Sequence, residues 1–169
     1  LLLDRADLDR PTLFLWRGSR AVVMGKNQNP WRECNLALLR ERGVALARRV
    51  SGGGAVYHDP GNLNISWVMP RDRYDGSELH AVLIRVLARF GLEAEAGAGG
   101  GLRVDGKKVS GAAFCYRKGN VLHHGTMLLT ADLPLLRAAL SPPRLRVDTH
   151  AVDSIPARVA NLADLRPDL

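Results

Sequence analysis

The hydrophobic residues of this chain follow two different periods, and this switch limits the folds that the chain can adopt. In residues 62–69 apolar and polar residues alternate, as expected of a half-buried β-strand. In residues 77–91 apolar residues recur every three or four positions, which predicts one face of a helix. With 169 residues and no internal repeat, the chain is expected to form one domain that combines strands and helices.

Turn signals place further strands around these two segments. The apolar runs Leu13–Trp16 and Ala21–Met24 flank the turn-like residues 17–20 and predict a hairpin. Asp105-Gly106 and Lys118-Gly119-Asn120 predict two more hairpins. The expected fold class is therefore α+β, with a mixed, largely antiparallel sheet and packed helices.

Capping residues define two further helices. Asn29 is expected to cap a helix that has Pro30 in its first turn and ends at Gly43. Asp132 is expected to cap a shorter helix that ends at residues 141–143, Ser-Pro-Pro. Together with residues 77–91, these segments supply the helices that should pack on the sheet.

The composition restricts the partners of the chain. A net charge of +7 favours an anionic partner, but aromatic residues make up only 5% and do not interleave with basic ones, so no nucleic-acid partner is expected. No apolar run approaches the roughly 20 residues of a membrane span. Two cysteines, Cys34 and Cys115, cannot build a disulfide framework, so we expect a cytoplasmic protein without a membrane partner. A basic nucleotide- or nucleic-acid-binding module is the alternative that charge alone supports.

The most informative segment is residues 48–59, which read Arg-Arg-Val-Ser-Gly-Gly-Gly-Ala-Val-Tyr-His-Asp. Three consecutive glycines between strand-like runs cost backbone entropy when they are ordered. Close approach of a phosphate to bare backbone N–H groups explains that cost, and two arginines can bind phosphate bidentately. We predict an anion site here, against the alternative of a flexible loop with solvated arginines.

A second informative segment surrounds Lys108. If Lys107 faces solvent, alternation along a strand turns Lys108 inward. An inward lysine is costly unless it meets an anion, although two solvated lysines beside a turn are an equal alternative on this segment alone. The small residues 110–113 leave room for a ligand or for a neighbouring strand.

Several familiar sites are excluded. Residues 101–107 have the spacing of a phosphate-binding loop, but Lys108 stands where that motif needs Ser or Thr, and a strand follows instead of a helix. Ser51 lacks the flanking glycines of a hydrolase elbow. His58-Asp59 and His123-His124 are neighbours on strands, so each pair points to opposite faces. No Cys/His spacing suggests zinc, and no protein metal site is expected.

These segments resemble the lipoate-protein ligases of the biotin and lipoate ligase superfamily. The blocks that carry the resemblance span most of the chain. They are Leu15-Trp16-Arg17, residues 28–35, residues 46–59, Gly61-Asn62, residues 108–112, residues 123–126, Leu128-Leu129, residues 131–133 and residues 158–162.

The resemblance implies one catalytic domain over residues 1–169 with the class II synthetase-like fold of that superfamily. It also implies two half-reactions. Lipoate attacks the α-phosphate of ATP, with Mg²⁺, to give lipoyl-AMP and pyrophosphate; a lysine of an acceptor lipoyl domain then takes the lipoyl group and releases AMP. The acceptors would be lipoyl domains of 2-oxoacid dehydrogenase complexes or the glycine cleavage H protein.

The resemblance further assigns site residues. Lys108 would be the catalytic residue, with its ammonium between the acyl carbonyl and the phosphate. The residues implied to bind ATP and lipoyl-adenylate are Arg49, Ser51, Gly53, Gly54, Ala55, Val56, Tyr57, His58 and Lys108.

The chain also departs from the family pattern. Family members usually carry Arg-Asn-Asp where this chain has Gly99-Gly100-Gly101. The alternative is therefore a lipoyl or octanoyl transferase that uses preformed acyl-AMP. The family's C-terminal accessory domain is expected to be absent from residues 1–169, so a separate accessory domain or subunit is a further expected partner.

Overall fold

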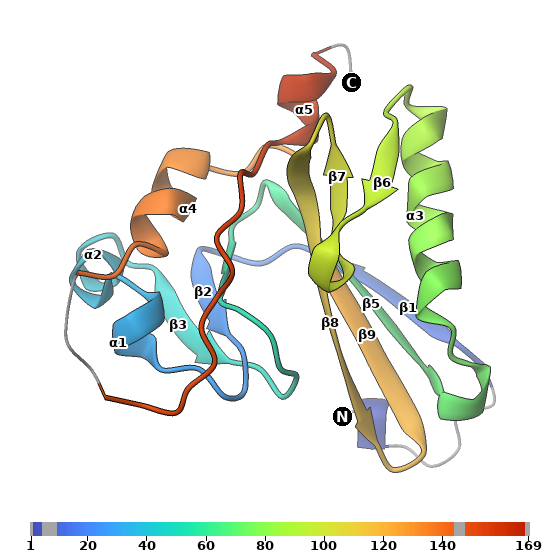
Figure 1. The fold of residues 1–169 in the computed structure, drawn as a ribbon, viewed down its shortest axis with the longest axis horizontal. Helices are drawn as coiled ribbons and strands as arrows, with labels where there is room; N and C mark the ends of the chain where they lie inside the picture. Colours follow the sequence, from blue (N-terminus) through green and yellow to red (C-terminus); the bar gives the residue numbers. More distant parts are fainter. Residues whose placement is uncertain (1, 5–9, 144–147, 168–169) are drawn as a thin grey trace.

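The computed structural model describes residues 2–4, 10–143 and 148–167, and it contains two β-sheets that lie beside each other (Figure 1). The larger sheet has six strands in the order β1-β5-β9-β8-β7-β6, and the smaller has three in the order β3-β2-β4. The predicted α+β class is confirmed, with the refinement that the strands form two sheets.

The elements have the following bounds. The strands are β1 (Thr12–Trp16), β2 (Ala21–Met24), β3 (Ala45–Arg48), β4 (Val56–His58), β5 (Asn62–Pro70), β6 (Ala94–Ala96), β7 (Leu102–Val104), β8 (Lys107–Arg117) and β9 (Asn120–Leu128). The α-helices are α1 (Pro30–Glu33), α2 (Leu36–Glu41), α3 (Gly76–Arg89), α4 (Leu133–Ala139) and α5 (Leu162–Leu165). The 3-10 helices are η1 (Leu2–Asp4), η2 (Arg71–Arg73) and η3 (Ala98–Gly100).

The larger sheet is antiparallel throughout, and two of its connections are the predicted hairpins. Asp105 and Gly106, with φ of 50° and 70°, join β7 to β8. Lys118 and Gly119, with φ of 48° and 77°, join β8 to β9. Both pairs adopt the left-handed conformation that two-residue hairpin turns require.

The hairpin predicted around residues 17–20 is wrong. β1 pairs with β5 in the larger sheet, whereas β2 pairs in parallel with β3 and antiparallel with β4 in the smaller sheet. The turn-like residues therefore carry the chain from one sheet to the other. The residues of the turn could not indicate this, because β1 and β2 form their hydrogen bonds with strands that are distant in the sequence.

The helix predicted from Asn29 to Gly43 is two helices. Asn29 caps α1 as predicted, and Gly43 follows α2 with φ of 61°. Between them Cys34 is extended, and the side chain of Asn35 accepts a hydrogen bond from the N–H of Leu38 at 3.1 Å. Asn35 is thus a second N-cap, and it ends one helix by beginning the next.

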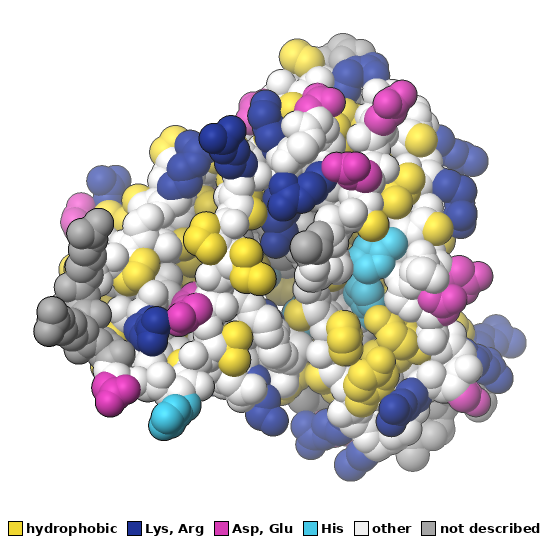
Figure 2. Space-filling model, viewed as in Figure 1, with side chains coloured by type: hydrophobic (Ala, Val, Ile, Leu, Met, Phe, Trp, Pro, Cys, Tyr) yellow, Lys and Arg dark blue, Asp and Glu magenta, His cyan; other side chains and the backbone are white. Residues whose placement is uncertain are grey.

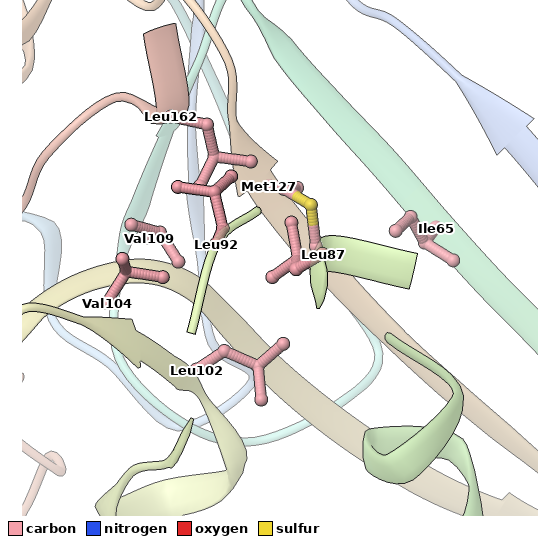
Figure 3. Close-up of a cluster of buried hydrophobic side chains, with 8 residues drawn as sticks. All are labelled: Ile65, Leu87, Leu92, Leu102, Val104, Val109, Met127 and Leu162. Carbon is pink, nitrogen blue, oxygen red and sulfur yellow. The ribbon is translucent and has the colours of Figure 1, made fainter. Parts of the chain in front are cut away.

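Each sheet has a core of its own. The larger sheet packs against α3, which Asp75 caps, around eight buried apolar residues (Figure 3). The predicted helix over residues 77–91 is confirmed, although Val82, Val86 and Phe90 on its apolar face are exposed. The core of the smaller sheet includes Cys34 and residues of α2 and α4. Among the described residues, no helix combines the length and apolarity that a bilayer crossing requires.

The alternation of apolar and polar residues in β5 predicts a half-buried strand. The alternation is present, but Asn62 and Asn64 are only 0% and 3% exposed. Both asparagines lie on the face that looks toward the smaller sheet, where Asn64 lines a cavity. The second sheet therefore buries a polar face that a single-sheet prediction leaves in solvent.

Candidate ligand-binding site

Two cavities lie between the sheets and share a wall. Their volumes are about 480 Å³ and 540 Å³, and Lys108, Gly111 and Thr126 line both. The extended segment 153–157 also lines both cavities and runs between the two sheets, as the red chain in Figure 1 shows. Figure 2 shows Lys and Arg side chains above the hollow on this face.

The glycine segment connects β3 to β4 and forms part of this wall. Its conformation depends on Arg49, whose three guanidinium nitrogens all donate hydrogen bonds to the protein. Their acceptors, at 2.6 to 3.1 Å, are Ser51 Oγ and the carbonyl oxygens of Val23, Gly52 and Gly54. Burial lowers the pKa of this guanidinium. Arg49 therefore braces the glycine loop as well as lining the larger cavity.

Ser51 in that loop forms a part-buried hydrogen-bonded pair with His124, which lines the larger cavity. Ser51 is 1% exposed, and its Oγ lies 2.6 Å from Nε2 of His124 on β9. Burial, with a smaller contribution from the charge of Arg49, lowers the pKa of His124 to about 4, so its imidazole is neutral at pH 7. The pair fastens the glycine loop of one sheet to a strand of the other.

The remaining predicted residues of the segment divide between the cavities. Tyr57 lines the smaller one and His58 the larger one, while Ala55 and Val56 line both. Burial is the main cause that lowers the pKa of His58 to about 4 and raises that of Tyr57 to about 12. Both side chains are thus neutral at pH 7. Gly53, with φ of 87°, lies in the left-handed region that glycine adopts freely.

Lys108 is turned inward, as its sequence position predicts, while Lys107 is exposed. The C-terminal segment holds the backbone of Lys108. The N–H of Lys108 donates to Arg158 O at 2.8 Å, and its carbonyl accepts from Ala160 N at 3.1 Å. A Cβ at Gly111 would lie 3.5 Å from Lys108 Nζ, an ordinary contact distance, so the ammonium lies beside Gly111. Burial lowers the pKa of Lys108, and the charge of Arg103 adds to this effect.

Ser154 anchors the segment that crosses the site. Its Oγ accepts hydrogen bonds from Ala55 N at 2.9 Å and Gln28 Nε2 at 3.0 Å, and it donates to a carboxylate oxygen of Glu33. Glu33 is itself only 5% exposed. This network joins α1, the glycine segment and segment 153–157 around the smaller cavity.

Carboxylates are scarce in the two cavities. Within the described part of the chain, no group of three His, Cys, Asp or Glu side chains could hold a metal ion. Asp153 is engaged with Arg32 at 2.7 Å, and Glu33 is engaged with Ser154. The described residues therefore do not form a magnesium site of their own.

Sequence reasoning missed several residues that the fold brings to the site. Arg103, Asn64 and Ser154 line the cavities, and His124 holds Ser51. His124 is 73 positions from Ser51, and Ser154 is 99 positions from Ala55, so no local motif could connect them. For Arg103 the sequence did hold a usable signal. Alternation along the strand places Lys108 inward, and Arg103 is paired with Lys108 across the predicted hairpin, so it lies on the same face.

The fold defines an α+β domain with two cavities between its sheets, and the lining of the larger cavity includes the cationic residues Arg49, Arg103 and Lys108. The whole chain, residues 1–169, matches the family model of the lipoyl protein ligase A/B catalytic domain, and it belongs to that family.

Curated relatives support the assignment. The chain is 41% identical over 161 residues to a lipoate-protein ligase A of Psychrobacter cryohalolentis, covering 95% of this chain and 48% of the relative. It is 40% identical over 172 residues to a lipoate-protein ligase A of Bdellovibrio bacteriovorus, covering 99% of this chain and 51% of the relative. The chain thus spans about half the length of these curated relatives.

Solved structures share the fold. P. falciparum LipL1 in complex with lipoate has a TM-score of 0.81 and 37% identity, over 94% of this chain and 45% of that one. A lipoate-protein ligase A bound with ATP has a TM-score of 0.78 and 32% identity, over 99% and 72%. A bi-partite lipoate protein ligase of Thermoplasma acidophilum, described with its E2 lipoyl domain, has a TM-score of 0.75 and 33% identity, over 96% and 69%.

Proposed function

We propose that the protein containing this chain is an ATP-dependent lipoate-protein ligase that forms lipoyl-AMP and transfers the lipoyl group to a lysine of a lipoyl domain. The position of Lys108 carries the proposal. Its side chain is half-buried and lines both cavities, so one ammonium can meet ligands in each. The relatives' names, and the structures of relatives bound to lipoate and to ATP, support lipoate and ATP as those ligands.

The first half-reaction needs positive charge and no protein nucleophile. A carboxylate oxygen of lipoate attacks the α-phosphorus of ATP, the bond from that phosphorus to the bridging oxygen breaks, and pyrophosphate leaves with the electron pair. Lys108 stabilises the negative charge that builds on the α-phosphoryl oxygens. A fixed cation in a partly dry cavity often contributes on the order of 10²–10³ in rate.

The second half-reaction uses the same cation. The lysine amine of the acceptor attacks the carbonyl carbon of lipoyl-AMP, and negative charge builds on the carbonyl oxygen beside Lys108. The bond from that carbon to the phosphate oxygen breaks, AMP leaves with the electron pair, and the amine nitrogen loses a proton to water. Neither thiol of the described chain suits covalent catalysis, because Cys34 and Cys115 do not line the cavities and burial raises the pKa of both, that of Cys34 to about 11. The lipoyl domain in the Thermoplasma structure supports a lipoyl domain as the acceptor.

The test separates the two half-reactions. The full-length protein, with any separate accessory subunit, is incubated with ATP, magnesium and lipoate, and pyrophosphate release is measured. Intact-mass analysis of an apo lipoyl domain then detects the acyl adduct. We expect Lys108→Ala to abolish both signals and Lys107→Ala, the exposed neighbour, to leave both intact. Absence of pyrophosphate from the wild type would contradict the adenylation step.

One observation favours a second candidate. Gly99 and Gly100, with φ of 73° and 79°, form a bare turn at the larger cavity where relatives of this family usually carry polar side chains. A transferase that uses preformed lipoyl-AMP would need fewer contacts to the nucleotide. Retained transfer from lipoyl-AMP without pyrophosphate release would select this candidate.

A further inference from the structure

Two cations face each other across the β7–β8 hairpin. Arg103 is the direct cross-strand partner of Lys108, and residues paired in this way share one face of the sheet. The pairing depends on a β-bulge, because Leu102 pairs with Ser110 and the next residue, Arg103, pairs with Lys108. Val109 is the extra residue of the bulge, which places the lysine opposite the arginine.

Glu95 on β6 is the other cross-strand partner of Arg103, but it is exposed and does not line the larger cavity. Among the described residues, no carboxylate forms an ion pair with this cation pair, Arg103 and Lys108. Both side chains are half-buried and line the larger cavity. Like charges placed directly opposite each other destabilise a sheet, and the charge of Arg103 lowers the pKa of Lys108. Of the described residues that line this cavity, Asp153 has the one carboxylate, and that group pairs with Arg32 at 2.7 Å. An anion is what would stabilise such a pair.

Arg103 has donors to offer such an anion. Among the described residues, its side chain makes a hydrogen bond through Nη1 alone, to Gly106 O at 2.8 Å. A Cβ at Gly97 would lie 3.2 Å from Arg103 Nε, so the guanidinium stem rests against the glycine turn that lines the cavity. Arg49, the other arginine of this cavity, has all three nitrogens engaged with the protein.

We propose that Arg103 binds the pyrophosphoryl group of ATP beside Lys108 and stabilises pyrophosphate as it leaves. A guanidinium can bind two phosphate oxygens at once, which suits the charge that the leaving group gains. Pyrophosphate is present in the first half-reaction and has left before the second. Arg103 is therefore needed for adenylation and dispensable for transfer, whereas Lys108 serves both steps. This role rests on the proposed function.

The kinetic test compares Arg103→Gln with Lys107→Gln, an exposed cation on the same hairpin. In the full-length protein, we expect Arg103→Gln to slow pyrophosphate release by about 10²-fold. Transfer from preformed lipoyl-AMP to an apo lipoyl domain should be unchanged. Arg103→Lys should recover part of the rate, because a point charge replaces the bidentate fork. Equal loss in both half-reactions, or loss in neither, would overturn the role.

A binding test separates this inference from the proposed function. Calorimetry measures the dissociation constant of inorganic pyrophosphate for the wild type and for Arg103→Gln. We expect at least about tenfold weaker binding by the variant, since a hydrogen bond to a charged group is lost. The wild type could release no pyrophosphate during turnover and still bind added pyrophosphate more tightly than Arg103→Gln does. That result would contradict the proposed function and support the anion site at Arg103. Equal dissociation constants would overturn the anion site, whatever the turnover.

Discussion

Ser51 Oγ and His124 Nε2 lie 2.6 Å apart, and this hydrogen bond joins the glycine segment to the larger sheet. Because Ser51 is 1% exposed, replacing its hydroxyl leaves part-buried polar groups of His124 and Arg49 without this partner. We expect Ser51→Ala to lower the free energy of unfolding by about 1–3 kcal/mol in urea denaturation. Ser19→Ala, at an exposed turn position, should change it by less than about 0.5 kcal/mol.

The buried histidines predict how stability depends on pH. Burial lowers the pKa of His58, His123 and His124 from 6.5 to about 4, helped by Arg49 for His58 and His124 and by His80 for His123. The folded protein therefore binds fewer protons than the unfolded chain in this range. Stability should be complete above pH 6.5 and should be lost as the pH falls through 4, by about 1.4 kcal/mol per pH unit for each such group.

Single variants test this pH dependence. His123→Gln should flatten the plot of unfolding free energy against pH between 6.5 and 4, because one buried titrating group is removed. Ser19→Ala, at an exposed turn position, removes no titrating group and should leave the slope unchanged. A slope that is the same in the wild type and in His123→Gln would contradict a neutral buried His123.

Lys108 predicts a conflict between stability and activity. Its ammonium is half-buried opposite Arg103, so its charge is unfavourable when no anion is bound. We expect Lys108→Met to keep or raise the thermal unfolding temperature while it abolishes pyrophosphate release. The measurement is differential scanning calorimetry without ligand, beside the activity assay. A large drop in unfolding temperature would contradict an unfavourable charge at this position.

Glycine positions within the loop predict different costs. Gly53 has φ of 87°, and a Cβ there would lie 3.1 Å from Arg49 Nη2, whereas a Cβ at Gly52 meets nothing within 4 Å. Gly53→Ala should therefore cost about 1–2 kcal/mol of unfolding free energy. Gly52→Ala should cost less than about 0.5 kcal/mol. Equal costs in urea denaturation would show that the left-handed conformation at Gly53 is not required.

Local signals in the sequence predicted elements well but predicted pairings poorly. Hairpin turns such as Asp105-Gly106 fix their own partners, because a two-residue turn leaves the flanking strands no alternative. Residues 17–20 also resemble a turn, yet β1 and β2 belong to different sheets. β1 pairs with β5 and β2 pairs with β4, and both partners are distant in the sequence. The predicted helix is interrupted at Asn35, which is the N-cap of α2. The N–H of Asn35 donates a hydrogen bond to Ala139 O, a contact that the local sequence does not indicate.

The site was predictable to the extent that it depends on local alternation. The inward position of Lys108 follows from its strand, while the partner that makes it a cation pair depends on a bulge at Val109. The link between Ser51 and His124 joins two sheets, and neither residue's neighbours in the sequence indicate the other. Long-range contacts of this kind arise only when the sheets pack together, so no period or motif encodes them.

Ser154 predicts the local stability of the segment that crosses the site. Its Oγ accepts hydrogen bonds from Ala55 and Gln28 and donates one to the buried carboxylate of Glu33. In Ser154→Ala the Glu33 carboxylate keeps one hydrogen bond from this segment, which the backbone N–H of residue 154 donates at 3.2 Å. We expect a loss of about 1.5–3 kcal/mol, felt mainly as local opening.

Limited proteolysis measures that opening. Cleavage within residues 148–157 should become faster in Ser154→Ala than in the wild type, while cleavage in the hairpins of the larger sheet should not change. Ser141 is the matched control, because this exposed serine donates to Arg137 O at 2.7 Å and makes none of the hydrogen bonds described for the segment. Cleavage of the segment at the wild-type rate in Ser154→Ala would mean that Val152, which donates to Asn27 O at 3.1 Å, holds the segment without the serine.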